Sequence, residues 1–333
     1  MVFIRVTSRD IAARAGVSQS TVSRVLRGDQ RVRAEARAAV LAALEATGYT
    51  PNRLARSMRG GPTDVIGVVV DNLANPFYQK LLNSLSEELS RRQQRLMVWV
   101  GQDVGDRAAI DAIHERLVDG VVFTATTASV LESALDAHIP LVLLNRTAAG
   151  MAVDQVCTNN AAAAYGLARY VARHGRRRVA IVGGPPDVST AADRTEGFQR
   201  GCRDGGLSAV DLLNGGFSYE RAHQVASVCL ARPDRPDTVL CVADLMAFAV
   251  IDAARSLGLA VPDDLWVVGF NGVEMAGWAS YSLTTAAQPL DAMVSEAVDL
   301  LLARMGAPQG EPQQRQLDAT IVVRGSTAHA PWS

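Results

Sequence analysis

Beyond Asp64 the chain alternates short apolar runs with stretches of helical periodicity, and this pattern constrains the fold more than any other feature. The runs are apolar on both faces, which is typical of parallel strands covered by helices on both sides. So many strands predict two α/β subdomains. We assign strands to 65–70, 96–100, 120–124, 141–144, 179–182, 238–242 and 266–270, and helices to 78–92, 110–117, 161–174, 194–204 and 247–257.

The first 49 residues have a different pattern, that of short helices joined by a glycine turn. Thr7 and Asp10 have the spacing of a capping box, and Gly16 ends the helix that they begin. Ser18 is placed to cap a second helix. We expect the inner faces to contain Ile11, Ala12, Ala15, the turn residue Val17, then Val22, Val25 and Leu26. A third helix over 33–47 should pack through Val40, Leu41 and Leu44 and end at Gly48.

This arrangement is that of a helix-turn-helix, whose second helix enters the major groove of DNA. Gln19 suits adenine, Arg24 suits guanine, and Ser20 suits a base or a phosphate. Residues 1–63 have eleven arginines and four acidic residues, a net charge of +7, which leaves −8 for the other 270. A small basic helical bundle with another role is the alternative. The expected DNA contacts in this part are Thr7, Ser18, Gln19, Ser20, Thr21, Ser23 and Arg24.

The segment 50–59 begins as a helix would, with Thr50 as cap and Pro51 at the first helical position, and it stops at Gly60. It is too short to be a stable helix alone. We therefore expect it to fold when DNA supports it, with Arg53, Arg56 and Arg59 facing phosphates. A plain basic linker is the alternative.

The sequence resembles the LacI/GalR family of bacterial repressors over essentially its whole length. The motifs that carry the resemblance are VTSRDIAARAGVSQSTVSRVLRG (6–28), GYTPNRLARSM (48–58), IGVVVDNLANPFY (66–78), DRTEGF (193–198), VPDDLWVVGFNG (261–272) and LTTAAQP (283–289). Their order and spacing make the match specific, although each motif alone would be weak.

The resemblance implies a helix-turn-helix head at 1–49, a hinge helix and linker at 50–62, and an α/β body like type I periplasmic binding proteins. The body would comprise an N-subdomain, 63–160 plus 290–317, and a C-subdomain, 161–289 plus 318–333. It also implies a homodimer on a pseudo-palindromic double-stranded operator, with paired hinge helices in the minor groove. Met58 replaces the Leu that the family inserts there as a wedge. The hinge contacts would be Asn52, Arg53, Ala55, Arg56 and Met58.

A small-molecule effector is expected between the subdomains, outside the carboxyl ends of the strands. In the family, the Arg of the Arg-x-x-Gly-Phe motif, here Arg194, commonly contacts a ligand hydroxyl or carboxylate. Phe217 is at the position of an aromatic that often stacks on a sugar or base. Strand ends and motifs together predict the effector residues Asn75, Phe77, Tyr78, Asn145, Arg146, Arg194, Phe217, Ala243, Asp244, Asn271 and Gln288.

Three departures from the family pattern bear on the effector. The chain has Ala243 where Asn is frequent, Asn271 where Asp is frequent, and Asn159 where Asp is frequent. Replacing Asp with Asn near Arg194 and Arg146 makes the cleft more positive. This favours a sugar acid or sugar phosphate over a neutral sugar. The alternative is that Asn271 packs structurally and says nothing about charge.

The sequence contains no catalytic, metal or cofactor motif that we recognise. Gly183-Gly184-Pro185-Pro186 lacks the spacing of a phosphate-binding loop, and the five histidines form no metal-ligand pair. No apolar run reaches the length of a membrane span, and no signal peptide precedes the charged residues. We therefore expect a cytoplasmic regulator rather than an enzyme. A transporter's solute-binding protein and a sugar-modifying enzyme with a DNA-binding fusion are the competing functions.

Overall fold

The computed structural model describes residues 6–26, 28–49, 61–126, 128–136, 138–207, 209–307 and 310–327. The chain divides into two compact units, residues 1–63 and 64–333. The hinge residues proposed from the sequence, Asn52, Arg53, Ala55, Arg56 and Met58, lie outside the described residues.

The first unit contains three helices, α1 (Ser8–Ala15), α2 (Gln19–Leu26) and α3 (Ala34–Thr47). The predicted capping box is confirmed, because the Thr7 side chain accepts from the Asp10 amide while the Asp10 carboxylate accepts from the Thr7 amide. Gly16 follows α1 in the left-handed conformation with φ +62°, which glycine adopts without a steric penalty. The Thr21 amide donates to Ser18 Oγ at 3.2 Å, the cap predicted for the second helix.

The core of this unit contains Ile11, Ala12, Val22, Val25, Val40 and Ala43. The prediction that Leu26 and Leu41 belong to the core is wrong, because their side chains are 38% and 53% exposed. Leu26 is the last residue of α2. Leu41 is the residue after the fully buried Val40 in α3. Successive helical residues are rotated by about 100°, so the Leu41 side chain points away from the inner face. Ala43 and the partly buried Leu44 continue the inner face instead.

The second unit contains two six-stranded sheets, ordered β11-β5-β4-β3-β1-β2 and β12-β10-β9-β8-β6-β7. All pairings are parallel except that of β10 with β12. The first sheet contains β1 (Val65–Val70), β2 (Arg95–Val100), β3 (Gly120–Phe123), β4 (Leu141–Leu144), β5 (Asp154–Thr158) and β11 (Gln314–Leu317). The second contains β6 (Arg178–Gly183), β7 (Ala209–Asn214), β8 (Thr238–Cys241), β9 (Trp266–Asn271), β10 (Thr284–Ala287) and β12 (Thr320–Val322).

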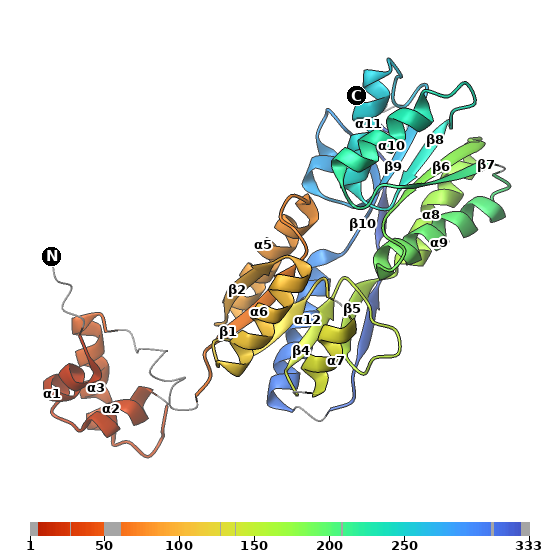
Figure 1. The fold of residues 1–333 in the computed structure, drawn as a ribbon. Helices are drawn as coiled ribbons and strands as arrows, with labels where there is room; N and C mark the ends of the chain where they lie inside the picture. The colour runs from red at the N-terminus through yellow and green to blue at the C-terminus, as the bar shows by residue number, and fades with distance from the viewer. Residues whose placement is uncertain are drawn as a thin grey trace. The chain divides into compact units, whose positions relative to one another are not determined.

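Each sheet is covered by helices on both faces, and we call the two layered bodies the N-terminal and C-terminal lobes (Figure 1). The N-terminal lobe has α5 (Pro76–Arg91), α6 (Gln102–His114), α7 (Ala128–Asp136) and α12 (Leu290–Gly306). The C-terminal lobe has α8 (Asn160–Arg173), α9 (Ser189–Asp204), α10 (Tyr219–Leu230), α11 (Asp244–Ser256) and the short 3₁₀ helix η1 (Glu274–Gly277). The predicted fold class, a helical head and an α/β body of two largely parallel sheets, is confirmed.

The chain passes from one lobe to the other three times, between β5 and α8, between β10 and α12, and between β11 and β12. A glycine sets the close approach of α8 and α9. A Cβ at Gly197 would lie 2.3 Å from the Ala161 carbonyl oxygen, so a larger residue would push these helices apart. That packing holds the first turns of α9 against the start of α8, where the candidate site lies.

Within the described residues, no helix has the length and apolar character needed to cross a membrane. In the same part of the chain, His, Cys, Asp and Glu side chains form no group of three or more that could hold a metal ion.

Candidate functional site

Both lobes contribute to a small cavity beyond the carboxyl ends of their strands. Its volume is about 20 Å³, room for only one or two water molecules. A sugar-sized ligand therefore requires the lobes or their side chains to move. The cavity is lined by Asp71, Asn72, Asn75, Phe77, Tyr78, Asn145 and Arg146 of the N-terminal lobe and by Thr190, Arg194, Phe217 and Asn271 of the C-terminal lobe.

Arg194 of α9 is the central polar group of this cavity and is only 2% exposed. Its Nε donates to Asn160 Oδ1 at 2.8 Å. Its Nη1 donates to the Val242 carbonyl at 2.8 Å and to Asn271 Oδ1 at 3.0 Å. The guanidinium also lies 3.9 Å from the centre of the Phe270 ring. These contacts fix the side chain, and every acceptor among them is neutral.

The charge of Arg194 therefore has no carboxylate in direct contact within the described part of the chain. Burial lowers the pKa of the guanidinium to about 9, against the opposing effect of the charges on Asp244 and Asp193. Arg194 thus remains a cation at neutral pH. A buried cation without a contacting counterion is costly, and an anionic ligand would relieve that cost.

Asn271 is the last residue of β9 and links Arg194 to the second crossover between the lobes. Its Oδ1 accepts from Arg194 and also from Gln288 Nε2 at 2.9 Å. Gln288 Oε1 accepts in turn from Thr158 Oγ1 at 2.6 Å. Asn271 therefore lines the cavity and has a structural role as well, whereas Gln288 does not line it.

The structure does not place Ala243 and Asp244 on the cavity wall, contrary to the sequence prediction. Both are fully buried. The Asp244 carboxylate accepts from Thr285 Oγ1 at 2.6 Å and from the Val273 amide at 2.9 Å. Burial raises the pKa of Asp244, and these hydrogen bonds oppose the rise. Through the bond from the Val273 amide, the carboxylate holds the turn after β9 in place.

On the N-terminal lobe, Arg146 Nη2 lies 3.4 Å from Asp71 Oδ2, a long ion pair. Tyr78 lines the cavity too, and burial raises the pKa of its hydroxyl despite the nearby Arg146 charge. Asn145 has φ +78°, and its buried Oδ1 has no hydrogen-bond partner among the described residues. The N-terminal side of the cavity thus offers one weakly paired cation and one unused acceptor.

Sequence reasoning missed three of the lining residues, Asp71, Asn72 and Thr190. Asp71 and Asn72 directly follow β1, so the rule that ligands bind outside the carboxyl ends of strands could have found them. Thr190 is in the first turn of α9, one turn of helix before Arg194.

Two hydrogen bonds join the lobes beside the cavity. The Thr147 amide donates to Ser189 Oγ at 3.0 Å, and Lys80 Nζ donates to the Gly272 carbonyl at 3.2 Å. Both bonds link loops or helix ends of different lobes, so both depend on the present arrangement of the lobes.

The polar face of α2 is available on the surface of the first unit. Ser18, Gln19, Ser20 and Arg24 are exposed, as is Thr7 before α1, whereas Thr21 and Ser23 are half-buried. Gln19 Nε2 donates to Ser8 Oγ at 2.7 Å, which ties the start of α2 to α1. This is the geometry of a helix that presents its N-terminal residues to base edges.

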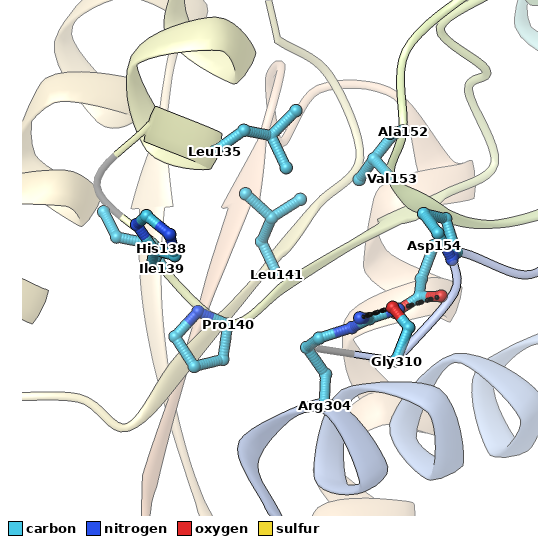
Figure 2. Close-up of a pocket in the computed structure, with 11 residues that line it drawn as sticks. Leu135, His138, Ile139, Pro140, Leu141, Ala152, Val153, Asp154, Arg304 and Gly310 are labelled. Carbon is cyan, nitrogen blue, oxygen red and sulfur yellow. Dashed lines mark hydrogen bonds and ion pairs between the residues drawn. The ribbon is translucent and has the colours of Figure 1, made fainter. Parts of the chain in front are cut away.

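A larger cavity, of about 200 Å³, lies in the N-terminal lobe and is lined mostly by apolar residues (Figure 2). Arg304 Nε and Nη2 donate to the two carboxylate oxygens of Asp154 at 2.8 and 3.0 Å. Because its charged groups satisfy each other, this cavity gives no sign of a charged ligand.

Comparisons with known proteins agree with this architecture. Residues 7–52 match the model for bacterial regulatory proteins of the lacI family, and 168–327 match the periplasmic binding protein-like domain. The chain is 29% identical to the HTH-type transcriptional repressor PurR of Klebsiella pneumoniae (strain 342), over 98% of each chain. It is 27% identical to the transcriptional regulator CelR in a cellobiose complex, with a TM-score of 0.72, over 97% of this chain and 100% of that one. The lac repressor dimer bound to operator and the anti-inducer ONPF has a TM-score of 0.85 at 24% identity, over 97% and 99%.

A helix-turn-helix unit followed by a two-lobed α/β body with a polar cavity between its lobes defines a DNA-binding transcriptional regulator with an effector domain. The chain belongs to the LacI family of bacterial regulatory proteins. It is thus a cytoplasmic transcription factor and not an enzyme, as the family is.

Proposed function

We propose that the protein is an effector-responsive repressor of an operon for the use of a sugar acid or sugar phosphate. It would bind a pseudo-palindromic operator as a homodimer, with the heads in the major groove and the hinge segments in the minor groove. The observation that carries the effector class is the environment of Arg194, a buried cation whose direct acceptors are all neutral.

An anionic group on the ligand would provide the counterion that the buried Arg194 guanidinium lacks. A carboxylate or phosphate facing Arg194 would form charge-assisted hydrogen bonds, which are stronger than those of a neutral hydroxyl. Arg146 lines the same cavity, and an anionic ligand that binds it would replace only the long ion pair with Asp71. The unused Oδ1 of Asn145 would accept a ligand hydroxyl, which fits a polyol chain.

The remaining walls suit the apolar face of a sugar ring. Phe217, in the left-handed conformation with φ +54°, packs so closely on Gly184 that a Cβ there would lie 2.7 Å from the ring. This contact fixes the ring on the C-terminal side of the cavity. Phe77, only 4% exposed, lines the opposite side.

Matched pairs of ligands test the effector class. We expect gluconate, galacturonate or glucose 6-phosphate to bind at least about tenfold more tightly than glucose or galactose, since each gains a charge-assisted contact with Arg194. A thermal-shift screen identifies which acidic sugar and matched neutral sugar to compare, because a ligand that binds the native state raises the melting temperature. Isothermal titration calorimetry then gives the affinities. Tighter binding of the neutral sugar of a pair would contradict an acidic effector. The panel of ligands screened also includes nucleosides as a further chemical class.

Control of DNA binding would follow from the lobe arrangement. A ligand can shift an equilibrium between two arrangements only by its differential affinity for them. The Thr147–Ser189 and Lys80–Gly272 bonds belong to one arrangement, in which the cavity is too small for a sugar. Ligand entry would break or rebuild them and so change the separation of the two hinge segments in a dimer.

A gel shift with DNA from upstream of the protein's own gene separates this function from its competitors. A repressor of this kind forms a discrete complex that survives competitor DNA. A solute-binding protein would give none, whereas a sugar-modifying enzyme with a DNA-binding fusion would also turn over a sugar.

A further inference from the structure

A second groove lies on the C-terminal lobe, between α8 and the edge strand β12. Its volume is about 520 Å³, within the range of sites for small ligands. None of its residues lines the cavity between the lobes. The groove is lined by Tyr165, Gly166, Arg169, Tyr170, Arg173, His174 and Ile321.

The groove concentrates positive charge that the protein does not neutralise. Arg169 and Arg173 are one turn apart on α8, so their side chains are neighbours. In the described part of the chain, neither arginine has an ion-pair partner. Arg200 of α9 lies 5.0 Å from the centre of the Tyr165 ring, which adds a third cation beside the groove.

One of these groups is buried as well as unpaired. Arg169 Nη1 is shielded from solvent and has no hydrogen-bond partner among the described residues. A buried donor without an acceptor destabilises the fold. An acceptor bound in the groove would satisfy this donor and remove the cost.

The aromatic side of the groove is held rigidly. The Tyr170 ring stacks on Trp266 at 5.9 Å between centres, and its hydroxyl is 3.2 Å from Thr327 Oγ1. His174 Nδ1 lies 2.8 Å from the Tyr170 carbonyl oxygen, and its ring packs on Tyr170 at 4.4 Å. A ligand would therefore meet a largely preformed wall.

The floor of the groove is apolar. A Cβ on Gly166 would lie 3.1 Å from Ile321 Cδ1, so the glycine lets the β12 side chain close against the helix. Ile321 is 36% exposed and provides an apolar contact beside the arginines. The groove thus combines two adjacent guanidinium groups with a small apolar surface.

We propose that this groove binds a phosphate-bearing small molecule at a site separate from the effector cavity. Two guanidinium groups one helical turn apart match the several oxygens of a phosphate or diphosphate better than the two of a carboxylate. The organic part would lie against Ile321 and the tyrosine rings. The proposal does not depend on the identity of the effector in the cavity.

Calorimetric titration of the full chain with inorganic pyrophosphate at constant ionic strength tests this site. We expect saturable binding of one pyrophosphate per chain in the groove. The double variant Arg169→Met, Arg173→Met should weaken it at least about tenfold, because two charge-assisted contacts are lost. Arg177→Met is the matched control, since Arg177 is exposed, close in sequence and outside the groove lining. Arg194→Met controls for binding in the cavity.

Thermal melting without pyrophosphate separates loss of the site from loss of the fold. Arg169→Met removes the unpaired donor and keeps the aliphatic stem, so it should melt at or above the wild-type temperature. The proposal is overturned by any of three results: no saturable binding to the wild type, equal weakening by Arg177→Met, or loss with Arg194→Met but not with the double variant.

Discussion

Replacing Arg194 with methionine is expected to lower the affinity for the effector at least about a hundredfold, since both the charge and the directed donors are lost. Methionine retains an unbranched apolar stem against Phe270 but cannot donate to Asn160, Val242 or Asn271. The measurement is calorimetric titration with the tightest-binding acidic ligand of the panel. Operator affinity without ligand should be retained, because the helix-turn-helix belongs to a separate compact unit.

Two further variants calibrate this result. Arg176 also lies over an aromatic ring on the C-terminal lobe, 4.5 Å from the centre of the Trp266 ring, but does not line the cavity. Arg176→Met should therefore leave effector affinity unchanged. Arg194→Lys keeps a cation without the planar fork and should bind with intermediate affinity. Wild-type affinity in Arg194→Met would show that the ligand binds elsewhere.

Met58→Ala is expected to weaken operator binding by about a hundredfold, because an apolar wedge opens the central base step on which the paired hinges depend. Fluorescence anisotropy with a labelled operator duplex measures this effect. Effector affinity should not change, since residue 58 is in the unit that does not contain the cavity.

Met58→Leu is the matched control for the wedge. Leucine has about the same volume and should bind the operator at least as tightly as the wild type. If alanine at this position leaves the operator affinity at its wild-type value, Met58 is not a wedge.

The central strands could be predicted from the sequence because they are buried on both faces. Val65–Val70 and Leu141–Leu144 were predicted with the bounds that the structure has. The edge strand Gln314–Leu317 was not, because it is half-exposed and reads as polar. Helix α12 was also missed. It is buried on several sides, and its apolar residues form no narrow stripe.

The residues of the candidate site also divide into those that the sequence could predict and those that it could not. Asn145 was found because it follows Leu141–Leu144, and Asn271 because it lies at the carboxyl end of Trp266–Asn271. Arg194 was found from its motif. Asp244 also lies near such a strand end, yet its carboxylate bonds Thr285 and the Val273 amide. Position in sequence identifies the edge of the sheet, whereas the direction of a side chain depends on partners that only the folded chain brings together.

The coupling between cavity and DNA is tested most directly by operator affinity in the absence and presence of a saturating acidic ligand from the panel. The wild-type dissociation constant should change at least about tenfold, within the usual range of coupling between sites. Arg194→Met should show no change at the same ligand concentration. An operator affinity that stays constant while calorimetry shows the cavity to be occupied would contradict an effector-controlled repressor.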